Sequence, residues 1–590
     1  MVLGSATPVP LAESPSAVLV LPVETQLLSV ESPQDLLRQD TSIFIEQRGA
    51  GGGQADIVLR GGTFEQTLVL LNGFRMDDSQ TSHHNLDLPV PFEAMDSIEV
   101  LHGAGSTLHG TDALSGVVDF LTSAPSGNSL RLRAGGGSFG GNEESMLGAL
   151  AHKQLSSRLT ASRNFSTGFT ADRDYRNEDS SVESWVGTKV GISNVMLAMS
   201  DRSFGANQFY GPYNSWERTK GWFASARQEL GARTVAAFGY RRHTDEFVLL
   251  RNNPSVYENN HIDGSWQASL RHTQTVAKSS ALLAGLESDG DSIQSNNLGL
   301  HARNRGAGYL DLDLRPAKSR WNLSGGLREE LISSGARSVL APHLAGSFRL
   351  TEKLKLRAGG GYGFRIPTYT DLYYSDPATL GNSKLKPESA WSGEVGADWA
   401  PSNRLSLSAT GFYNRQHDTI DYVRAVSLPN PLLPAGCPVN KWCATNLNGV
   451  HFQGVETNLT WVPARAQRIQ LGWTGLAGGQ DSLTGLQSEY ALNYPVENLH
   501  ATWTAAFGRI LTLTNSVAVA KPYQQPGIPP WNASPYPVWN VSVTHDQRRL
   551  RPYLRLGNLS NTGYQEIVGV PMPGRSITGG VSLWLGRRSD

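Results

Sequence analysis

The sequence contains no long hydrophobic run. No stretch approaches the 18 consecutive apolar residues that a membrane-spanning helix needs, and the longest candidate, Ala17 to Val23, contains Pro22. A transmembrane helix is therefore excluded. A closed β-barrel is still compatible with the sequence, because it is the other structure that satisfies every backbone polar group in lipid.

Cysteine is scarce. Cys437 and Cys443 are the two in the chain, and they fall within the segment from Pro434 to Thr445. We predict a short disulfide-closed loop in an oxidising compartment, with a pair of free thiols as the alternative. A structural zinc would need four ligands and no histidine lies in this segment, so no metal site is predicted there.

Neither sign of charge is in excess. Lys and Arg number 51 against 52 Asp and Glu, which gives a net charge of -1 and excludes the basic footprint of a nucleic-acid-binding protein. The chain also lacks the His-Glu-x-x-His pattern of zinc proteases, and no spaced pair of carboxylates stands out. We expect neither enzymatic activity nor a cofactor.

The composition is typical of a protein with many β-strands that are each apolar on one face, and not of a protein with one large hydrophobic core. Hydrophobic residues make up 39%, which is low, while glycine (62) is abundant and Trp (14) and Tyr (18) are well represented. These proportions fit apolar side chains spread over one face of many strands in a membrane barrel. A length of 590 residues also implies at least two folding units.

From about Leu130 the sequence alternates between apolar and polar residues with a period of two. The clearest examples are 354–364, 405–410, 455–461 and 576–585. An apolar outside and a polar inside is the pattern of a transmembrane barrel, although a soluble sandwich alternates too. A soluble propeller would show a repeat of 40–50 residues, and we find none.

The stretch from Asp56 to Thr122 has a different texture. Three short apolar runs, each stopped by glycine or Asn-Gly, predict short strands in a small twisted sheet. Asn72-Gly73 is a strong hairpin signal, because a type I′ turn needs a positive φ at both central residues.

These residues resemble the plug domain of TonB-dependent outer-membrane receptors. The matching positions are Arg60, Gly61, Asn72, Gly73, Glu99, Gly103, Ser106, Gly110 and Gly116. Five positions depart from the family pattern: Asn72 stands for Asp, Ala104 for Pro, His109 for Tyr, Ser115 for Gly and Asp119 for Asn. None of these departures removes a turn glycine. Further similarity to family barrels appears at 204–210, 363–396 and 553–585.

The resemblance implies a mainly β fold, with a small N-terminal α+β plug domain inside an antiparallel transmembrane β-barrel of about 22 strands. We assign residues 1–15 to a disordered N-terminal segment, 16–125 to the plug and 126–590 to the barrel. Subtracting 125 residues from 590 leaves 465, or about 21 for each of roughly 22 strands with its connection. That length accommodates strands of about 10 residues with short turns and long outer loops.

The implied function is energy-coupled uptake of a scarce, bulky nutrient of the siderophore or cobalamin class across the outer membrane of a Gram-negative bacterium. The implied partners are outer-membrane lipid, the nutrient itself and a TonB-type inner-membrane protein that pulls on the plug, with no nucleic acid. The alternative is a structural or adhesive barrel that no longer transports.

The N-terminal region allows two interpretations of the segment that would contact the TonB-type partner. Residues 1–15 contain no Lys or Arg and no apolar core, so they are not a secretory signal peptide. The run Val18-Leu19-Val20-Leu21 is either the segment that adds as a strand to the TonB-type partner or the first strand of the plug. We prefer the plug strand.

Candidate ligand contacts follow the Asn-Gly hairpin. Asp77, Asp78, His83 and His84 lie where plug loops of the family face substrate. A polar loop is favoured over a metal site, because spacing fixes no third ligand. Aromatic residues that would suit a macrocycle, or would simply pack in loops and girdles, are Trp216, Trp442, Tyr373 and Tyr374. The acidic segments 172–179 and 287–291 are interpreted as solvated outer loops rather than calcium sites.

Overall fold

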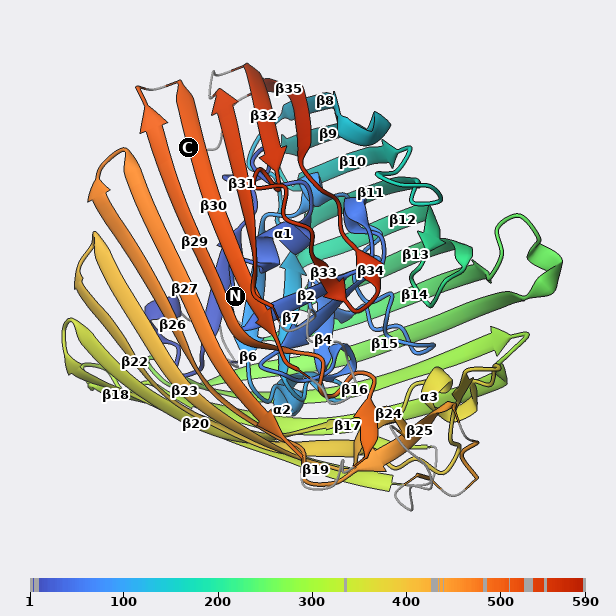
Figure 1. The fold of residues 1–590 in the computed structure, drawn as a ribbon. Helices are drawn as coiled ribbons and strands as arrows, with labels where there is room; N and C mark the ends of the chain where they lie inside the picture. Colours follow the sequence, from blue (N-terminus) through green and yellow to red (C-terminus); the bar gives the residue numbers. More distant parts are fainter. Residues whose placement is uncertain are drawn as a thin grey trace.

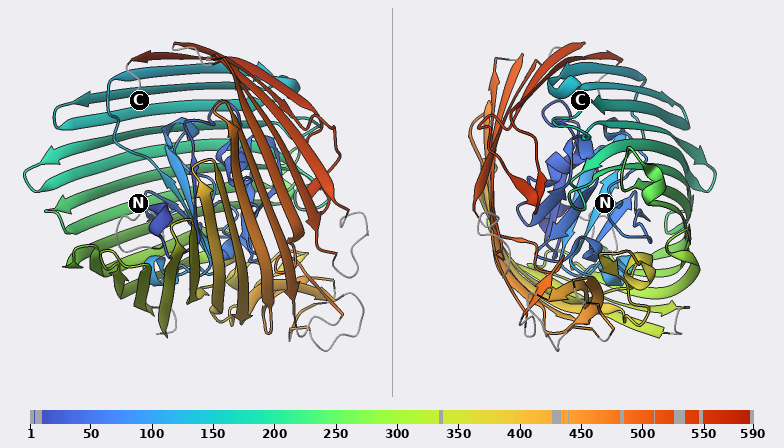
Figure 2. Two further views of the ribbon diagram at one scale, coloured as in Figure 1. Left: turned by 90° about the vertical axis from the view of Figure 1, so that its left-hand side faces the viewer. Right: turned by 45° about the vertical axis from the view of Figure 1, so that its right-hand side comes forward.

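The computed structural model describes residue 4 and residues 10–333, 337–425, 433–434, 436–438, 440–480, 485–508, 510–524, 534–545 and 549–586. A large barrel surrounds an N-terminal domain, which is drawn in blue inside the strands in Figures 1 and 2. Among these residues, no helix is both long and apolar enough to span a membrane. The disorder predicted for 1–15 falls mostly outside the described residues, and Leu11–Glu13 form a short 3-10 helix (η1).

Twenty-two of the described strands form the closed barrel, the number that the family resemblance implies. Each pairs antiparallel with its neighbour along the chain, and the last strand, β35, pairs with the first, β8. Their bounds are β8 (Ser129–Gly137), β9 (Asn142–His152), β10 (Leu155–Ser166), β11 (Tyr175–Thr188), β12 (Gly191–Asn207), β13 (Asn214–Leu230), β14 (Thr234–Val248), β15 (Glu258–Ala277), β16 (Ser280–Ser295), β17 (Gly299–Leu314), β18 (Trp321–Ile332), β19 (Arg337–Thr351), β20 (Leu354–Arg365), β22 (Glu388–Ser402), β23 (Leu405–His417), β26 (His451–Ala464), β27 (Gln467–Gly479), β29 (Pro495–Phe507), β30 (Leu511–Pro522), β31 (Tyr536–His545), β32 (Leu550–Gly557) and β35 (Ser576–Gly586).

The barrel is apolar on its outside and polar within. In β18, Leu327 and Leu331 are 46% and 58% exposed on the outer face, whereas Arg328 and Glu330 between them are each 1% exposed. This inverts the pattern of a water-soluble protein. It follows from the alternation of side chains along a strand that has lipid on one side and the enclosed domain on the other.

The two ends of the barrel differ. Two-residue turns such as 153–154 and 403–404 join strands at one end, and long connections such as 366–387 and 418–450 join them at the other. In transmembrane barrels the short turns are periplasmic and the long loops extracellular, which orients this chain in the membrane.

The enclosed domain is built on a five-stranded sheet. Its order is β1-β6-β7-β4-β5, with β4 and β7 parallel and the other pairs antiparallel. The bounds are β1 (Val18–Pro22), β4 (Thr67–Leu71), β5 (Phe74–Arg75), β6 (Ser97–His102) and β7 (Gly116–Leu121). A separate hairpin, β2 (Ile43–Gln47) with β3 (Ala55–Leu59), and the helices α1 (Pro33–Leu37) and α2 (Ser106–His109) complete the domain.

Local sequence explains these elements. Asn72 (φ 53°) and Gly73 (φ 80°) form the two-residue turn between β4 and β5, so the predicted hairpin is confirmed. Helix α1 starts at Pro33, because the side chain of Asp35 accepts hydrogen bonds from the backbone N–H groups of Glu31 (3.0 Å) and Ser32 (3.2 Å).

The long connections carry structure of their own. Short strands and a helix form there: β21 (Thr379–Leu380), β24 (Thr419–Ala425), β25 (Trp442–Leu447), β28 (Leu486–Ser488), β33 (Gln565–Ile567), β34 (Val570–Pro571) and α3 (Tyr369–Tyr373). The remaining 3-10 helices are η2 (Ala50–Gly52), η3 (Phe64–Gln66), η4 (Phe92–Ala94), η5 (Ser138–Gly140) and η6 (Pro254–Val256). Cys437 and Cys443 form the predicted disulfide.

One interpretation of the sequence was wrong. The segment 287–291 is not an outer loop but the middle of β16, and the carboxylates of Glu287, Asp289 and Asp291 are buried inside the barrel. They are paired with lumen-facing arginines, and the acids recur every second residue because that face of the strand points inward. In the other acidic segment, residues 175–179 likewise belong to β11.

Candidate functional site

A large cavity lies between the enclosed domain and the long connections. Its volume is about 1200 Å³, and its lining comes from the domain, from the barrel wall and from the ordered connections above them. Cavities that hold drug-sized ligands measure about 300–1,000 Å³, so this one suits a bulky molecule. It lies at the long-loop end, which faces the cell exterior.

His83 lies in the floor of the cavity. Its Nδ1 lies 2.9 Å from Asp56 Oδ2, and its ring stacks on Phe64 with centroids 4.2 Å apart. Burial lowers the pKa of His83 despite that carboxylate. Burial alone would raise the pKa of Asp56, but His83 and the Arg48 guanidinium at 2.8 Å hold it below its ordinary value.

His84 lies beside His83 in the floor and is more deeply buried, at 2% exposed. Its two ring nitrogens face carboxylates on different elements: Nδ1 faces Asp87 (3.5 Å), and Nε2 faces Glu217 (3.4 Å) and Asp245 (3.8 Å). Burial opposes protonation, yet the carboxylates of Asp245 and Asp87 beside the ring raise the pKa of His84 well above its ordinary value.

Aromatic rings and carboxylates dominate the upper walls. Among the described residues that line the cavity, eight carry carboxylates and two, Arg48 and Arg424, carry guanidinium groups. Tyr490 stands edge-on to Phe64, with ring centroids 5.3 Å apart. Of the aromatic residues weighed in the sequence, Tyr374 and Trp442 line the cavity, whereas Trp216 and Tyr373 are not in its lining.

Buried carboxyls in the lining favour the neutral form. Burial raises the pKa of Glu489 to about 8 and that of Glu46 and Glu65 well above the ordinary value. A cationic group placed in the cavity would favour their ionised forms, because an opposite charge stabilises a carboxylate.

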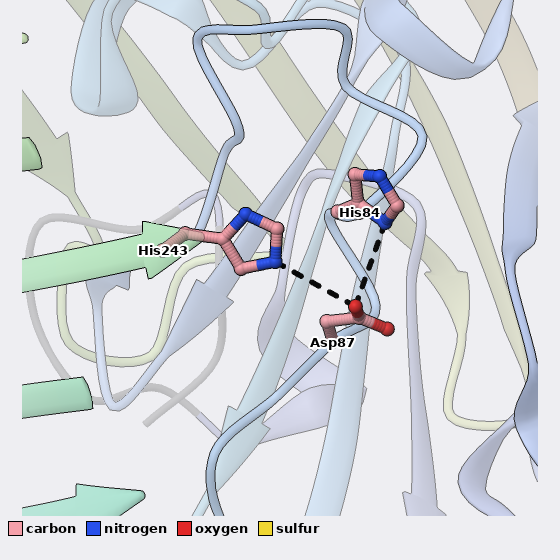
Figure 3. A group of neighbouring side chains, drawn as sticks. All are labelled: His84, Asp87 and His243. Atoms are coloured by element: carbon pink, nitrogen blue, oxygen red, sulfur yellow. Dashed lines mark ion pairs between the residues drawn. The ribbon is translucent and has the colours of Figure 1, made fainter. Parts of the chain in front are cut away.

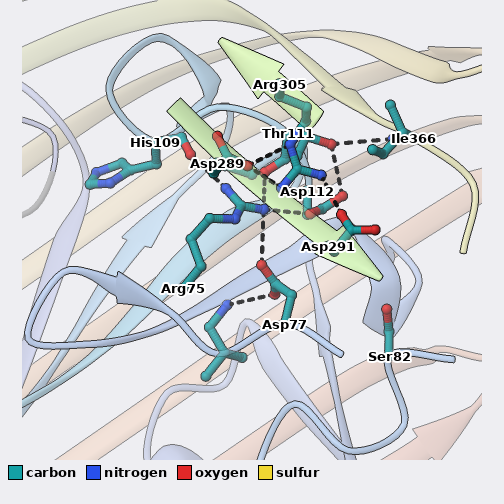
Figure 4. A network of polar contacts seen from close by, with 12 residues as sticks. Arg75, Asp77, Ser82, His109, Thr111, Asp112, Asp289, Asp291, Arg305 and Ile366 are labelled. Atoms are coloured by element: carbon teal, nitrogen blue, oxygen red, sulfur yellow. Dashed lines mark hydrogen bonds and ion pairs between the residues drawn. The ribbon is translucent and has the colours of Figure 1, made fainter. Parts of the chain in front are cut away.

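Asp77 and Asp78 lie apart from this cavity. Asp77 belongs to a network around Arg75, whose guanidinium contacts the carboxylates of Asp77 (2.9 Å) and Asp112 (2.5 Å) (Figure 4). Asp78 is 1% exposed, and its backbone N–H donates to Asn85. Of the four predicted contacts, the structure thus places the two histidines at the cavity and the two aspartates beside a smaller one.

Arg60 joins the enclosed domain to the barrel wall. It follows β3 directly and contacts Glu456 on β26 (2.5 Å) and Glu394 on β22 (2.8 Å). The next residue, Gly61, has a φ of 81°, and a Cβ placed there would lie 2.5 Å from the ring of Phe452. The Arg-Gly pair therefore fits a tight turn against the barrel.

The other predicted motif positions shape the sheet and its turns. Gly116 begins β7, where a Cβ would lie 2.5 Å from the carbonyl oxygen of Leu101, and Glu99 is buried in β6. Ser106 starts α2, and its hydroxyl donates to Ala113 O (3.3 Å). Three more positions lie in turns with positive φ: Asn72, Gly103 and Gly110.

The segment Val18–Leu21 lies in β1, at the edge of the five-stranded sheet. It pairs antiparallel with β6 from Val18↔Leu101 to Pro22↔Ser97. The segment is therefore part of the sheet of the enclosed domain.

Several lining residues come from the barrel wall, and we did not single them out from the sequence. Glu217 comes from β13, Asp245 from β14 and His261 from β15. Their signal is a period-two polar pattern, as in Arg241, His243 and Asp245, which are all buried on the inward face.

A 22-stranded barrel that encloses a separate domain, with a ligand-sized cavity facing outward, defines an outer-membrane receptor of the plugged type. Two family descriptions match the chain: "TonB-dependent Receptor Plug Domain" over residues 10–117 and "TonB dependent receptor-like, beta-barrel" over residues 113–580. The chain belongs to the TonB-dependent receptor family, whose members take up nutrients across the outer membrane of Gram-negative bacteria.

Similar proteins include the vitamin B12 transporter BtuB of Photobacterium profundum. It is 27% identical over 459 residues, which cover 73% of this chain and 71% of the relative. The iron-regulated outer membrane virulence protein of Vibrio cholerae is 24% identical over 461 residues, covering 69% and 66% of the two chains.

Solved structures share the fold. The siderophore receptor PirA from Pseudomonas aeruginosa superposes with a TM-score of 0.73 at 17% identity and covers 96% of this chain and 99% of its own. The copper transporter OprC gives a TM-score of 0.78 at 16% identity and covers 99% and 100%.

Proposed function

We propose that this receptor imports a bulky, neutral or cationic nutrient of the cobalamin class. The observation that carries the proposal is the lining of the outer cavity, which is rich in aromatic rings and has eight carboxylates against two guanidinium groups. Aromatic faces suit a large flat macrocycle. A strongly anionic ferric catecholate would call for an arginine-rich wall, whereas only two guanidinium groups are found among the described lining residues.

Two aromatic side chains give the sharpest binding test. Tyr490 belongs to the cluster of aromatic rings above the floor. The guanidinium of Arg424 lies over Trp442, with its carbon 4.4 Å from the centroid of the Trp442 ring. Tyr490→Ala and Trp442→Ala should each weaken cyanocobalamin binding by about tenfold or more, because removing an anchor residue typically costs at least 1–2 kcal/mol. Trp321→Ala, at the short-turn end of the barrel and 43% exposed, is the matched control.

The binding assay distinguishes the nutrient classes. We expect the purified receptor to bind cyanocobalamin and to reject ferric enterobactin. Tight binding of the ferric chelate with none of cyanocobalamin would contradict the cobalamin assignment. If the receptor binds neither compound, the proposal that the cavity selects a ligand of the cobalamin class is also contradicted.

The mechanism that we propose is capture followed by energy-coupled release into the periplasm. Residues 16–125 act as the plug and residues 126–590 as the barrel, and a TonB-type protein pulls on the N-terminal part of the plug near Val18–Leu21. The four-residue segment is the edge strand of its sheet, the kind of element to which a partner can add a strand. The protein performs no chemical conversion of its ligand.

Coupling can be measured directly. Uptake of radiolabelled cyanocobalamin should stop when the proton-motive force is collapsed, and the receptor should bind the C-terminal domain of TonB. A receptor that binds its nutrient but shows neither property would instead be a barrel that no longer transports.

A further inference from the structure

A cluster of histidine and carboxylate groups lies beneath the cavity floor, where the plug meets the barrel. His84 and Asp87 belong to the plug loop, and His243 belongs to barrel strand β14 (Figure 3). Asp87 Oδ2 lies 3.5 Å from His84 Nδ1 and 3.7 Å from His243 Nε2. The three side chains converge on one point, although they come from two domains.

The imidazole of His243 is buried, and its two nitrogen atoms make no hydrogen bond to the described residues. The residue is 1% exposed. The Nδ1 of His84, which is 2% exposed, also lacks a hydrogen bond there. A buried polar atom without a partner is costly, so these nitrogens, aimed at the same carboxylate oxygen, point to a ligand between them.

Negative charge is in excess around this point. The carboxylates that surround the two histidines are Asp78, Asp87, Glu217, Asp245 and Asp263. The neighbouring guanidinium groups are Arg202, which lies 3.3 Å from Asp87 Oδ1, and Arg241, which donates to the carbonyl of Asp77. A bound cation would offset charges that the arginines leave uncompensated.

The ligand set and its spacing suit a transition metal. Two ligands at 2.0–2.2 Å from a tetrahedral zinc lie about 3.3–3.6 Å apart, close to the 3.5 and 3.7 Å that separate Asp87 from the two histidines. Two imidazoles with one carboxylate favour a late first-row divalent ion, whereas calcium takes six to eight oxygens.

We propose that His84 Nδ1, Asp87 Oδ2 and His243 Nε2 form a binding site for a divalent late first-row metal ion such as Zn²⁺. Water from the cavity supplies the fourth position. The sequence disfavoured a metal here because the spacing along the chain fixes no complete ligand set. The barrel supplies the third ligand from β14.

Surrounding groups support the three ligands. His84 Nε2 faces Glu217 (3.4 Å) and Asp245 (3.8 Å), the arrangement that usually fixes the tautomer of a metal-bound histidine. Thr219 donates its hydroxyl to Asp87 Oδ2 (2.7 Å) and holds that carboxylate in place.

The site joins the two domains, because two ligands are in the plug and one is in the barrel. A bound ion therefore anchors the plug loop to the barrel wall at the cavity floor. This role is independent of which nutrient the receptor imports.

Calorimetric titration of the full-length receptor in detergent, without a polyhistidine tag, tests the proposal with ZnCl₂. We expect saturable binding of about one Zn²⁺ per chain. His243→Gln and Asp87→Asn should each weaken zinc binding by more than about 100-fold. Losing a residue that only hydrogen-bonds a metal ligand already costs up to about 100-fold in affinity, and these two residues are ligands themselves. His152→Gln, at an exposed position at the end of β9, should leave binding unchanged.

A crystal of the zinc-soaked wild-type receptor provides a second readout that needs no variant to fold. The anomalous signal at the zinc edge should lie between the three side chains. The proposal is overturned by an absence of saturable binding, by full binding in His243→Gln, or by an anomalous peak elsewhere.

Discussion

Replacing Arg60 with methionine should loosen the plug from the barrel wall. Arg60 makes two hydrogen bonds to Glu456 (2.5 and 3.2 Å) and one to Glu394 (2.8 Å), and all three side chains are at most 12% exposed. Methionine keeps an unbranched apolar stem but removes the charged guanidinium, which lies over the ring of Phe412. Glu394 retains Arg357 at 3.3 Å, so Glu456 is left as the uncompensated buried carboxylate.

The expected cost is about 3–5 kcal/mol, the range for removing one partner of a buried ion pair. With about 1.4 kcal/mol for each factor of ten, the population of plug openings that break this contact rises by roughly two to three and a half orders of magnitude. Hydrogen exchange of the amides in Ala55–Leu59, measured on the whole receptor, reports that population. Exchange there should accelerate by the same factor.

Two further variants show whether the charge is the cause. Arg60→Met combined with Glu456→Gln should recover most of the protection, because the orphaned charge is then gone. Arg163→Met removes an arginine whose side chain is 41% exposed beside Glu178, and exchange in the plug should stay unchanged, as surface pairs contribute little. Less than a threefold change in Arg60→Met, or a double variant as fast as the single one, would refute the reasoning.

Three other changes should shift local stability. Burial raises the pKa of Asp119 to about 7, above its unfolded value of about 3.9, so plug stability falls as pH rises from about 4 to 7; Asp119→Asn should raise plug protection by up to about 4 kcal/mol at pH 8 and by little at pH 4. Replacing Cys437 and Cys443 with serine should lower the local stability of the outer loop by about 2 kcal/mol. Limited proteolysis of the loop should then be faster, while the melting temperature of the barrel stays unchanged. Gly61→Ala should lower the plug's unfolding free energy by at least about 1–2 kcal/mol, measured by hydrogen exchange, because its φ is positive and a Cβ there would meet Phe452; unchanged exchange would contradict this.

Local patterns in the sequence predict the fold well. The period-two alternation predicts barrel strands, and Asn72-Gly73 predicts a hairpin, because each depends on residues close together in the chain. The segment 287–291 was misassigned because a run of acidic residues suggests exposure to solvent. The arginines that pair with these acids are on neighbouring strands, which the sequence alone does not place. His83 and His84 were recognised as ligand candidates, but Glu217, Asp245 and His243 beside them come from distant strands. No spacing along the chain brings those side chains together.

The pairing of β35 with β8 constrains how this receptor can be assembled. Leu583 lies opposite Leu132 in that seam, so the ring is completed only when the last strand of the chain has reached the first. The plug precedes β8 in the sequence and lies wholly within the ring, and β7 leads into it through a connection of only seven residues, 122–128. The seam therefore separates two stages of biogenesis. Until it forms, the open sheet has two unpaired edges, and the plug can take its place from the side. Once it forms, the same contact that seals the wall against lipid also confines the plug.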